Sequence, residues 1–131
     1  MGPLSVLLDT HVFVWALTDS ADLKAPARKL IGEAETRFVS AASYWEIATK
    51  ARLGKWPGVE ACLLSRKKLV DFGFTPLALD IKTAARAGSF EWEHRDPFDR
   101  ILVAQAERKK VPLLSYDGAL SGQHWARIVR G

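Results

Sequence analysis

Acidic residues beside short apolar runs are the part of this sequence that could do chemistry. Asp9 ends one apolar run and Asp117 follows another. Glu46 and Asp99 lie in early turns of two predicted helices. Carboxylates that converge repel one another, so at neutral pH they stay ionised together only if a cation joins them. Oxygen ligands favour Mg²⁺ or Mn²⁺ over zinc, and such ions activate water and clamp a phosphodiester for in-line attack.

The elements that must position these acids follow from the apolar pattern. Short apolar runs predict five strands, at residues 4–8, 37–40, 74–79, 111–115 and 126–129. Helical patterns lie between them, at residues 11–18, 26–35, 43–53, 59–72, 80–88 and 98–110. Pro76 indicates that its strand lies at an edge of the sheet or begins there. Strands separated by helices predict an α/β fold with a mostly parallel sheet covered on both faces.

In such a sheet, ligands bind beyond the carboxyl ends of the strands, near the point where strand order reverses. The sequence therefore predicts that the four acids gather at this edge. Each acid alone also fits a local structural role. The local contexts are those of a helix cap or a turn: Asp9 at a strand–helix junction, Ser43 with Glu46 in a capping box, Asp96 before Pro97, and Asp117 before Gly118. Asp99 then falls in the first turn of its helix, where its charge suits the helix dipole. The joint placement favours the metal site.

Composition is that of an ordinary globular protein. The 131 residues suit a single domain over residues 1–131, with 48 % hydrophobic and 26 % charged residues. Nineteen Lys and Arg against 15 Asp and Glu give a net charge of +4, which suits a polyanionic partner without proving one. The single cysteine, Cys62, excludes an internal disulfide and a cysteine-based zinc site. No apolar run approaches the ~18 residues of a membrane span, so we expect a cytoplasmic protein without a membrane partner.

Four stretches carry a family resemblance, in this order along the chain: Leu7–His11, Val39–Lys50 with Gly54–Lys55, His94–Ala106, and Leu113–Asp117. On these stretches the sequence resembles the PIN-domain ribonucleases, and most closely the VapC-like toxins of prokaryotic toxin–antitoxin pairs. The stretches run in family order and span nearly the whole chain. The Asp-Pro-Phe-Asp-Arg block at residues 96–100 is the most specific of them.

The resemblance implies a three-layer α/β/α PIN-like fold whose acidic cluster holds Mg²⁺ or Mn²⁺ for RNA cleavage. The residues that match the family's acidic quartet are Asp9, Glu46, Asp99 and Asp117. Asp96 lies beside them and is a further metal ligand, directly or through water. Thr10 and Ser115 stand where the family places hydroxyls that orient these carboxylates, and Ser115 replaces a commoner threonine. Asp117 matches the least constant of the four acids.

The resemblance also implies a VapB-like antitoxin that blocks the site, often through a basic side chain, and a homodimer. Basic residues near the acids are the candidate contacts to RNA phosphates: Lys50, Arg52, Lys55, Arg95 and Arg100. Trp56 and Trp92 lie in polar surroundings, where they either stack on unpaired bases or pack within the protein, and packing is favoured. For His11 and His94 we expect a polar packing role.

Other functions remain open at this point. A haloacid-dehalogenase-type phosphatase would need a second Asp two residues after Asp9, where the chain has His11. A receiver domain would need paired acids ahead of its first-strand Asp region, and these are missing. A non-catalytic PIN-fold binding module would be expected to have lost at least one acid of the quartet. A housekeeping RNA-processing nuclease would use the same site, but the short chain favours the toxin.

Overall fold

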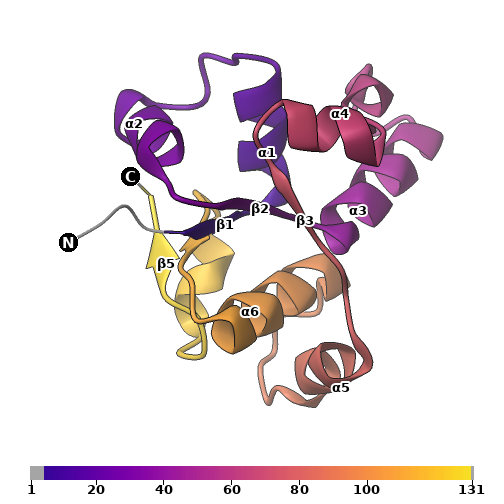
Figure 1. Cartoon of the computed structure of the whole chain (residues 1–131). Coiled ribbons are helices and arrows are strands. Elements are labelled where there is room, and N and C mark those ends of the chain that lie inside the picture. The colour runs from indigo at the N-terminus through magenta and orange to yellow at the C-terminus, as the bar shows by residue number, and fades with distance from the viewer. Residues whose placement is uncertain (1–4, 131) are drawn as a thin grey trace.

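The sheet that positions the acids is parallel throughout in this computed structural model, which describes residues 5–130 (Figure 1). Its strands are β1 (Val6–Leu8), β2 (Arg37–Ser40), β3 (Thr75–Leu77), β4 (Leu113–Leu114) and β5 (Ile128–Val129). They lie in the order β3-β2-β1-β4-β5. This arrangement confirms the predicted α/β fold with a parallel sheet.

Helices cover both faces of this sheet. The α-helices are α1 (Thr10–Leu17), α2 (Ala25–Glu33), α3 (Ala41–Arg52), α4 (Arg66–Asp71), α5 (Ile81–Ser89) and α6 (Pro97–Lys109). Two short 3₁₀ helices are η1 (Val59–Cys62) and η2 (Gly118–Gly122). In Figure 1, α1, α2 and α4 lie above the strands and α5 and α6 below them, which gives three layers.

The core is divided by the sheet into two clusters, and β1 contributes to both. Val6 and Leu8 pack with Phe13 of α1 in one cluster, whereas Leu7 packs with Leu102 of α6 in the other. All three β1 side chains are fully buried. Side chains alternate between the faces of a strand, so a continuous apolar run is what a central parallel strand requires.

The sheet has its topological switch point at β1. The chain runs outward from β1 to β2 and β3, and then returns to pair β4 with the other side of β1. Connections that leave a strand pair in opposite directions open a crevice at the carboxyl ends of those strands. The residues after β1 and β4 therefore lie at the place where open α/β sheets bind ligands.

Some predicted elements differ from the observed ones. The helix predicted over residues 59–72 is wrong, because the segment is divided into η1 and α4. Ser65 ends the irregular connection by accepting a hydrogen bond from the Lys68 N–H, which starts α4 anew. Pro76 lies in β3 at the sheet edge, as predicted. Leu4, the predicted start of the first strand, lies outside the described residues. Within residues 5–130, no helix combines the length and apolarity that crossing a membrane requires.

Candidate active site

Asp9 occupies the junction between β1 and α1. Its Oδ1 accepts a hydrogen bond from the Val12 N–H at 3.0 Å, so it caps α1, and its Oδ2 accepts one from the Ser115 hydroxyl. Its own N–H donates to the Leu114 carbonyl of β4. Only 6 % of the residue is exposed. The capping role is thus real, and it fixes the orientation of a buried carboxylate at the switch point.

Ser115 joins the ends of β1 and β4. Its buried hydroxyl donates to Asp9 and accepts from the Asp117 N–H at 3.0 Å. This is the orienting role that the family resemblance implied for Ser115. Asp117 is exposed and accepts from the Ala119 N–H at 2.9 Å, which caps η2. One serine therefore ties the position of Asp117 to that of Asp9.

The hydroxyl of Thr10 does not contact a carboxylate, contrary to the expectation. It donates to the Ser43 hydroxyl of α3 at 2.9 Å, and both residues are buried. Thr10 begins α1, and its hydroxyl contacts α3 through Ser43. Its contact nevertheless serves the site indirectly, because it holds α3 against the start of α1, next to Asp9.

Glu46 lies in the second turn of α3, with 5 % of the residue exposed. The capping box of Ser43 and Glu46 is wrong, because α3 begins at Ala41 and the cap is Ser40, which accepts from the Ala42 N–H. Glu46 is free of a capping role and pairs with Lys50, whose Nζ lies 2.7 Å from its Oε2. Lys50 thus neutralises a buried acid besides facing solvent.

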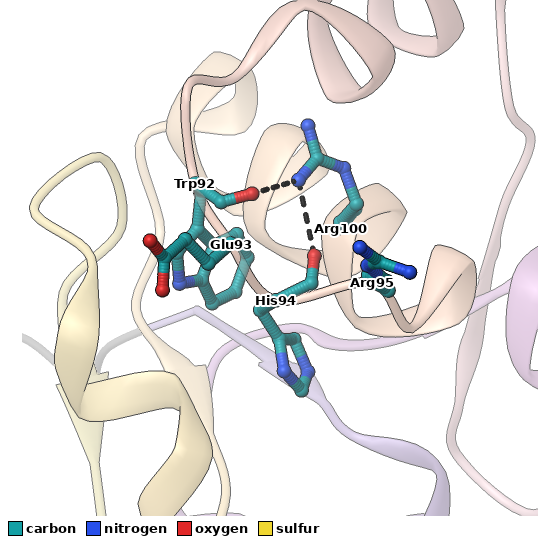
Figure 2. A pocket seen from close by; sticks show the side chains of 5 residues that line it. All are labelled: Trp92, Glu93, His94, Arg95 and Arg100. Carbon is teal, nitrogen blue, oxygen red and sulfur yellow. Dashed lines mark hydrogen bonds between the residues drawn. The ribbon is translucent and has the colours of Figure 1, made fainter.

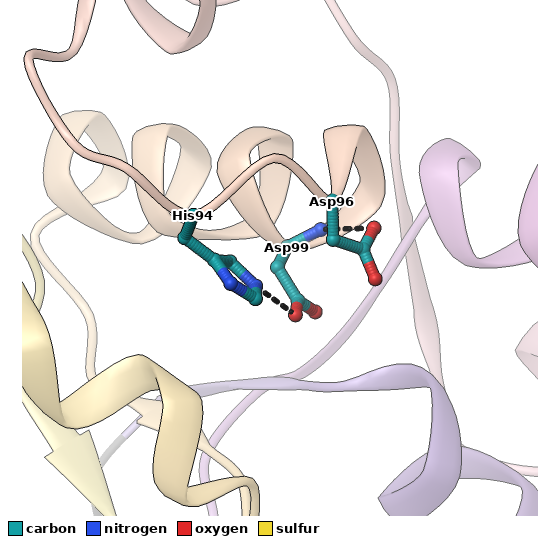
Figure 3. A group of neighbouring side chains, drawn as sticks. All are labelled: His94, Asp96 and Asp99. Carbon is teal, nitrogen blue, oxygen red and sulfur yellow. Dashed lines mark hydrogen bonds and ion pairs between the residues drawn. The ribbon is translucent and has the colours of Figure 1, made fainter.

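The start of α6 holds two more acids. Asp96 caps the helix by accepting from the Phe98 and Asp99 N–H groups, and Pro97 occupies the first helical position, as predicted. Asp99 projects from the first turn, and its Oδ2 lies 2.8 Å from Nε2 of His94 (Figure 3). Figure 3 shows the His94 and Asp99 side chains pointing toward one another from the loop and the helix.

His94, for which a polar packing role was expected, contacts an acid of the candidate site. One potential ligand atom each from His94, Asp96 and Asp99 lie within 4.8 Å of one another. Asp9, Glu46 and Asp117 are not part of this close group. The available signal was proximity in sequence, since His94 directly precedes the Arg-Asp-Pro-Phe-Asp stretch.

Charge interactions join the acids in two sets: Asp99 with Asp96 and Asp117, and Asp9 with Glu46. The pKa of Asp99 is raised to about 6, chiefly by burial. The charges of Asp96 and Asp117 contribute to this rise, and the His94 hydrogen bond opposes it. Burial also raises the pKa of Asp9, and Glu46 adds to the increase, while hydrogen bonds from Ser115 and Val12 lower it. Both central acids are therefore destabilised as anions, as expected for carboxylates gathered without a cation.

Two pockets open beside these acids. Asp9 and Asp117 line one of about 210 Å³, together with His11, Trp15 and Tyr116. A second, of about 650 Å³, is lined by the loop before α6 and by Arg100 (Figure 2). The lining residues of the second pocket are Trp92, Glu93, His94, Arg95 and Arg100.

Arg100 was expected to contact RNA phosphates, and the structure assigns it a different role. Its guanidinium donates to five backbone carbonyls of the segment that leads into α6, and Figure 2 shows two of these bonds. The accepting carbonyls belong to Ala87, Gly88, Phe90, Trp92 and His94. All five guanidinium N–H donors can be used in this way, so Arg100 shapes the loop that carries His94.

A family model described as the PIN domain matches residues 6–122. The chain belongs to the PIN-domain family. Comparison with curated protein sequences gives no significant match.

Solved structures with the same fold share little sequence with this PIN-domain chain. VapBC2 from Rickettsia felis, bound to a promoter DNA fragment, is 15 % identical with a TM-score of 0.68, over 96 % of this chain and 98 % of that one. DNA-bound VapBC from Salmonella typhimurium is 16 % identical with a TM-score of 0.67, over 96 % and 97 %. VapC20 of Mycobacterium tuberculosis, a toxin that cleaves the sarcin–ricin loop, is 16 % identical with a TM-score of 0.61, over 94 % and 99 %. At these identities the likeness establishes the fold.

The Arg100→Met variant tests the role of the guanidinium in the loop. The change leaves several carbonyls without a donor, and we expect the free energy of unfolding to fall by about 2–4 kcal/mol. Urea unfolding measures it. The exposed Arg95 lies in the same loop, and Arg95→Met should change stability by no more than about 0.5 kcal/mol. Equal effects of the two substitutions would contradict the assignment.

The Asp99→Asn variant tests the cost of ionising Asp99 in the folded protein. A folded-state pKa of about 6, above the ordinary 3.8, means that ionising Asp99 destabilises the fold. This penalty is absent below about pH 4, grows as the pH rises toward 6 and is complete above it. In EDTA we therefore expect Asp99→Asn to melt at a higher temperature than the wild type at pH 7, with the difference vanishing at pH 4. A variant that melts lower at pH 7 would show that Asp99 stabilises the fold as an anion.

Proposed function

We propose that this chain is a divalent-metal-dependent endoribonuclease that acts as the toxin of a toxin–antitoxin pair. The observation that carries the proposal is that a PIN-domain chain holds Asp9 buried and Asp99 partly buried. Burial raises the pKa of both carboxyl groups, and the charges of neighbouring acids add to the rise. Neighbouring carboxylates that are destabilised as anions gain stability when a cation binds between them, as in a metal site.

The donor set suits Mg²⁺ or Mn²⁺. Carboxylate oxygens predominate, and a hard cation prefers them, whereas a single histidine does not make a zinc site. Asp9, Glu46 and Asp99 would hold the metal, with Asp117 and Asp96 completing the cluster. A bound ion would supply the Lewis acid that activates water and stabilises charge on the phosphoryl oxygens.

The remaining groups of the site orient the acids and attract the substrate. Ser115 and the first turn of α1 hold the Asp9 carboxylate, and His94 holds that of Asp99. Lys50, beside Glu46, would contact a phosphate next to the scissile bond. Arg52, Lys55 and Arg95 are exposed and would attract the RNA backbone through charge. No histidine is required as nucleophile in this scheme.

The toxin role is supported by the solved structures that share this fold over nearly their full length. Two of these structures are VapBC complexes, and a third is of a toxin that cleaves the sarcin–ricin loop. By analogy, a VapB-like antitoxin would bind this chain in the cytoplasm and block the acids, and the toxin would be a homodimer. The proposal does not extend to the sarcin–ricin loop as the RNA that this chain cleaves, because residues outside the acidic cluster would select the RNA.

RNA cleavage by purified protein tests the nuclease. With Mn²⁺ or Mg²⁺ the wild type should cut mixed single-stranded RNA, and EDTA should abolish cutting. Asp9→Asn should lower the rate by about 100-fold or more, equivalent to roughly 3 kcal/mol of barrier. The matched control is Asp71→Asn, which removes an exposed acid paired with Lys67 on α4. Metal-independent cutting, or full activity of Asp9→Asn, would refute the mechanism.

Growth on expression separates a toxin from a housekeeping RNA-processing enzyme. We expect wild-type expression to arrest growth, and both Asp9→Asn and co-expression of the adjacent upstream reading frame to relieve the arrest. Plating efficiency under an inducible promoter measures it. Normal growth with an active nuclease at matched protein levels would favour RNA processing instead.

A further inference from the structure

We propose that His11, Trp15 and Trp56, with Lys50 and Lys55, form a subsite that binds one unpaired nucleobase and its phosphate beside the acidic cluster. The inference rests on the proposed function, because it names the form of RNA that this site takes: single-stranded, with a base turned out of any stack.

A pocket of about 240 Å³ carries the proposal, and these five residues line it. The His11 and Trp56 rings are stacked, with centroids 4.5 Å apart and an interplanar angle of 22°. Trp15 is tilted against His11 at 5.8 Å. Flat aromatic faces beside an open pocket are what proteins use to stack unpaired bases.

Positive charge accompanies the rings. The Lys50 Nζ lies 5.6 Å from the centre of the Trp56 ring and 2.7 Å from Oε2 of Glu46, so one ammonium group links the aromatic pocket to an acid of the site. Lys55 lines the same pocket and is exposed. Aromatic faces bind bases and ammonium groups bind phosphates, and both are needed for a nucleotide.

The aromatic pocket adjoins the acids. His11 and Trp15 line both this pocket and the one that contains Asp9 and Asp117. A base held against His11 and Trp56 would therefore place the adjoining backbone next to the carboxylates. Tyr116 also lines the Asp9 pocket, and its ring is tilted against that of Trp15 at 6.0 Å.

The other tryptophan considered for base stacking, Trp92, lines the pocket beside Arg100 and makes more packing contacts within the protein. Its ring is tilted against Trp125 at 6.0 Å, and Arg100 lies over it at 5.9 Å while donating to its carbonyl. His11, by contrast, is exposed on the first turn of α1. Of these two tryptophans, Trp56 is the one whose neighbours are an exposed aromatic ring and two lysines.

Nucleotide binding in EDTA tests the subsite without cleavage. The probes are AMP and ribose 5-phosphate, followed through the indole N–H signals of ¹⁵N-labelled wild type. We expect AMP to shift the signals of Trp15 and Trp56 but not that of Trp45, and ribose 5-phosphate to bind more weakly. Equal binding of the two probes would overturn the proposal, because the base would then contribute nothing.

Substitutions provide the second arm, measured by the anisotropy of a fluorescein-labelled eight-nucleotide RNA in EDTA. Trp56→Leu should weaken binding between roughly 5-fold and 100-fold, and Trp56→Phe should keep most of it. Trp45→Leu is the matched control, since Trp45 is 56 % exposed and contacts Phe98 outside this pocket. Equal losses in Trp45→Leu and Trp56→Leu would overturn the subsite.

His11→Ala guards against a folding defect, because His11 lies at the surface and Trp56 is partly buried against the core. It should also weaken RNA binding while leaving the melting temperature within a few degrees of the wild type. RNA cleavage with unchanged affinity in His11→Ala and Trp56→Leu would refute the subsite alone. If the wild type binds AMP more tightly than ribose 5-phosphate but does not cleave RNA in Mn²⁺, the proposed nuclease activity is refuted and the subsite is not.

Discussion

The cost of holding carboxylates away from water, increased by their mutual repulsion, is the constraint around which this molecule is arranged. Asp9 is buried and Asp99 is partly buried, each has a raised pKa, and each lies near at least one further acid. Because β1 pairs with β4, the chain cannot fold without bringing Asp9 close to the segment that carries Asp117. Burial of apolar side chains in the two clusters on either side of β1 offsets the free energy that the ionised acids cost the fold. Such a trade between stability and function is typical of active sites.

Neutral groups hold the acids in place to a large extent. Ser115 and the Val12 N–H fix Asp9, and a Thr10–Ser43 hydroxyl pair ties α1 to α3, which carries Glu46. Neutral donors orient a carboxylate without cancelling its charge, so its attraction for a cation is retained. The exception is the ammonium group of Lys50, which contacts Glu46. Asp99 is contacted by a ring nitrogen of His94. These two are the groups whose contacts would change most when a metal binds.

Local signals predicted most of the fold, and contacts distant in sequence explain what was missed. The caps at Asp9 and Asp96 and the edge strand at Pro76 were predicted, because each depends on neighbours within a few residues. The break before α4 and the Ser40 cap of α3 were not predicted, although Ser65 and Ser40 are residue types that commonly cap helices. The role of Arg100 depends on how the preceding segment folds back toward its guanidinium, from carbonyls as far away in sequence as Ala87. No local pattern shows this. Which acids of the candidate set share a metal is likewise a matter of tertiary geometry and stays a prediction.

We propose that Asp9 after β1, Glu46 of α3 and Asp99 of α6 together bind one divalent cation. The most direct measurement is anomalous X-ray diffraction at the manganese edge from crystals grown with Mn²⁺. The account predicts a peak in direct contact with carboxylate oxygens of both Asp9 and Asp99, with Glu46 in the same coordination sphere or one water away. A peak held by His94, Asp96 and Asp99 without Asp9, or no peak near these residues at millimolar Mn²⁺, would contradict it.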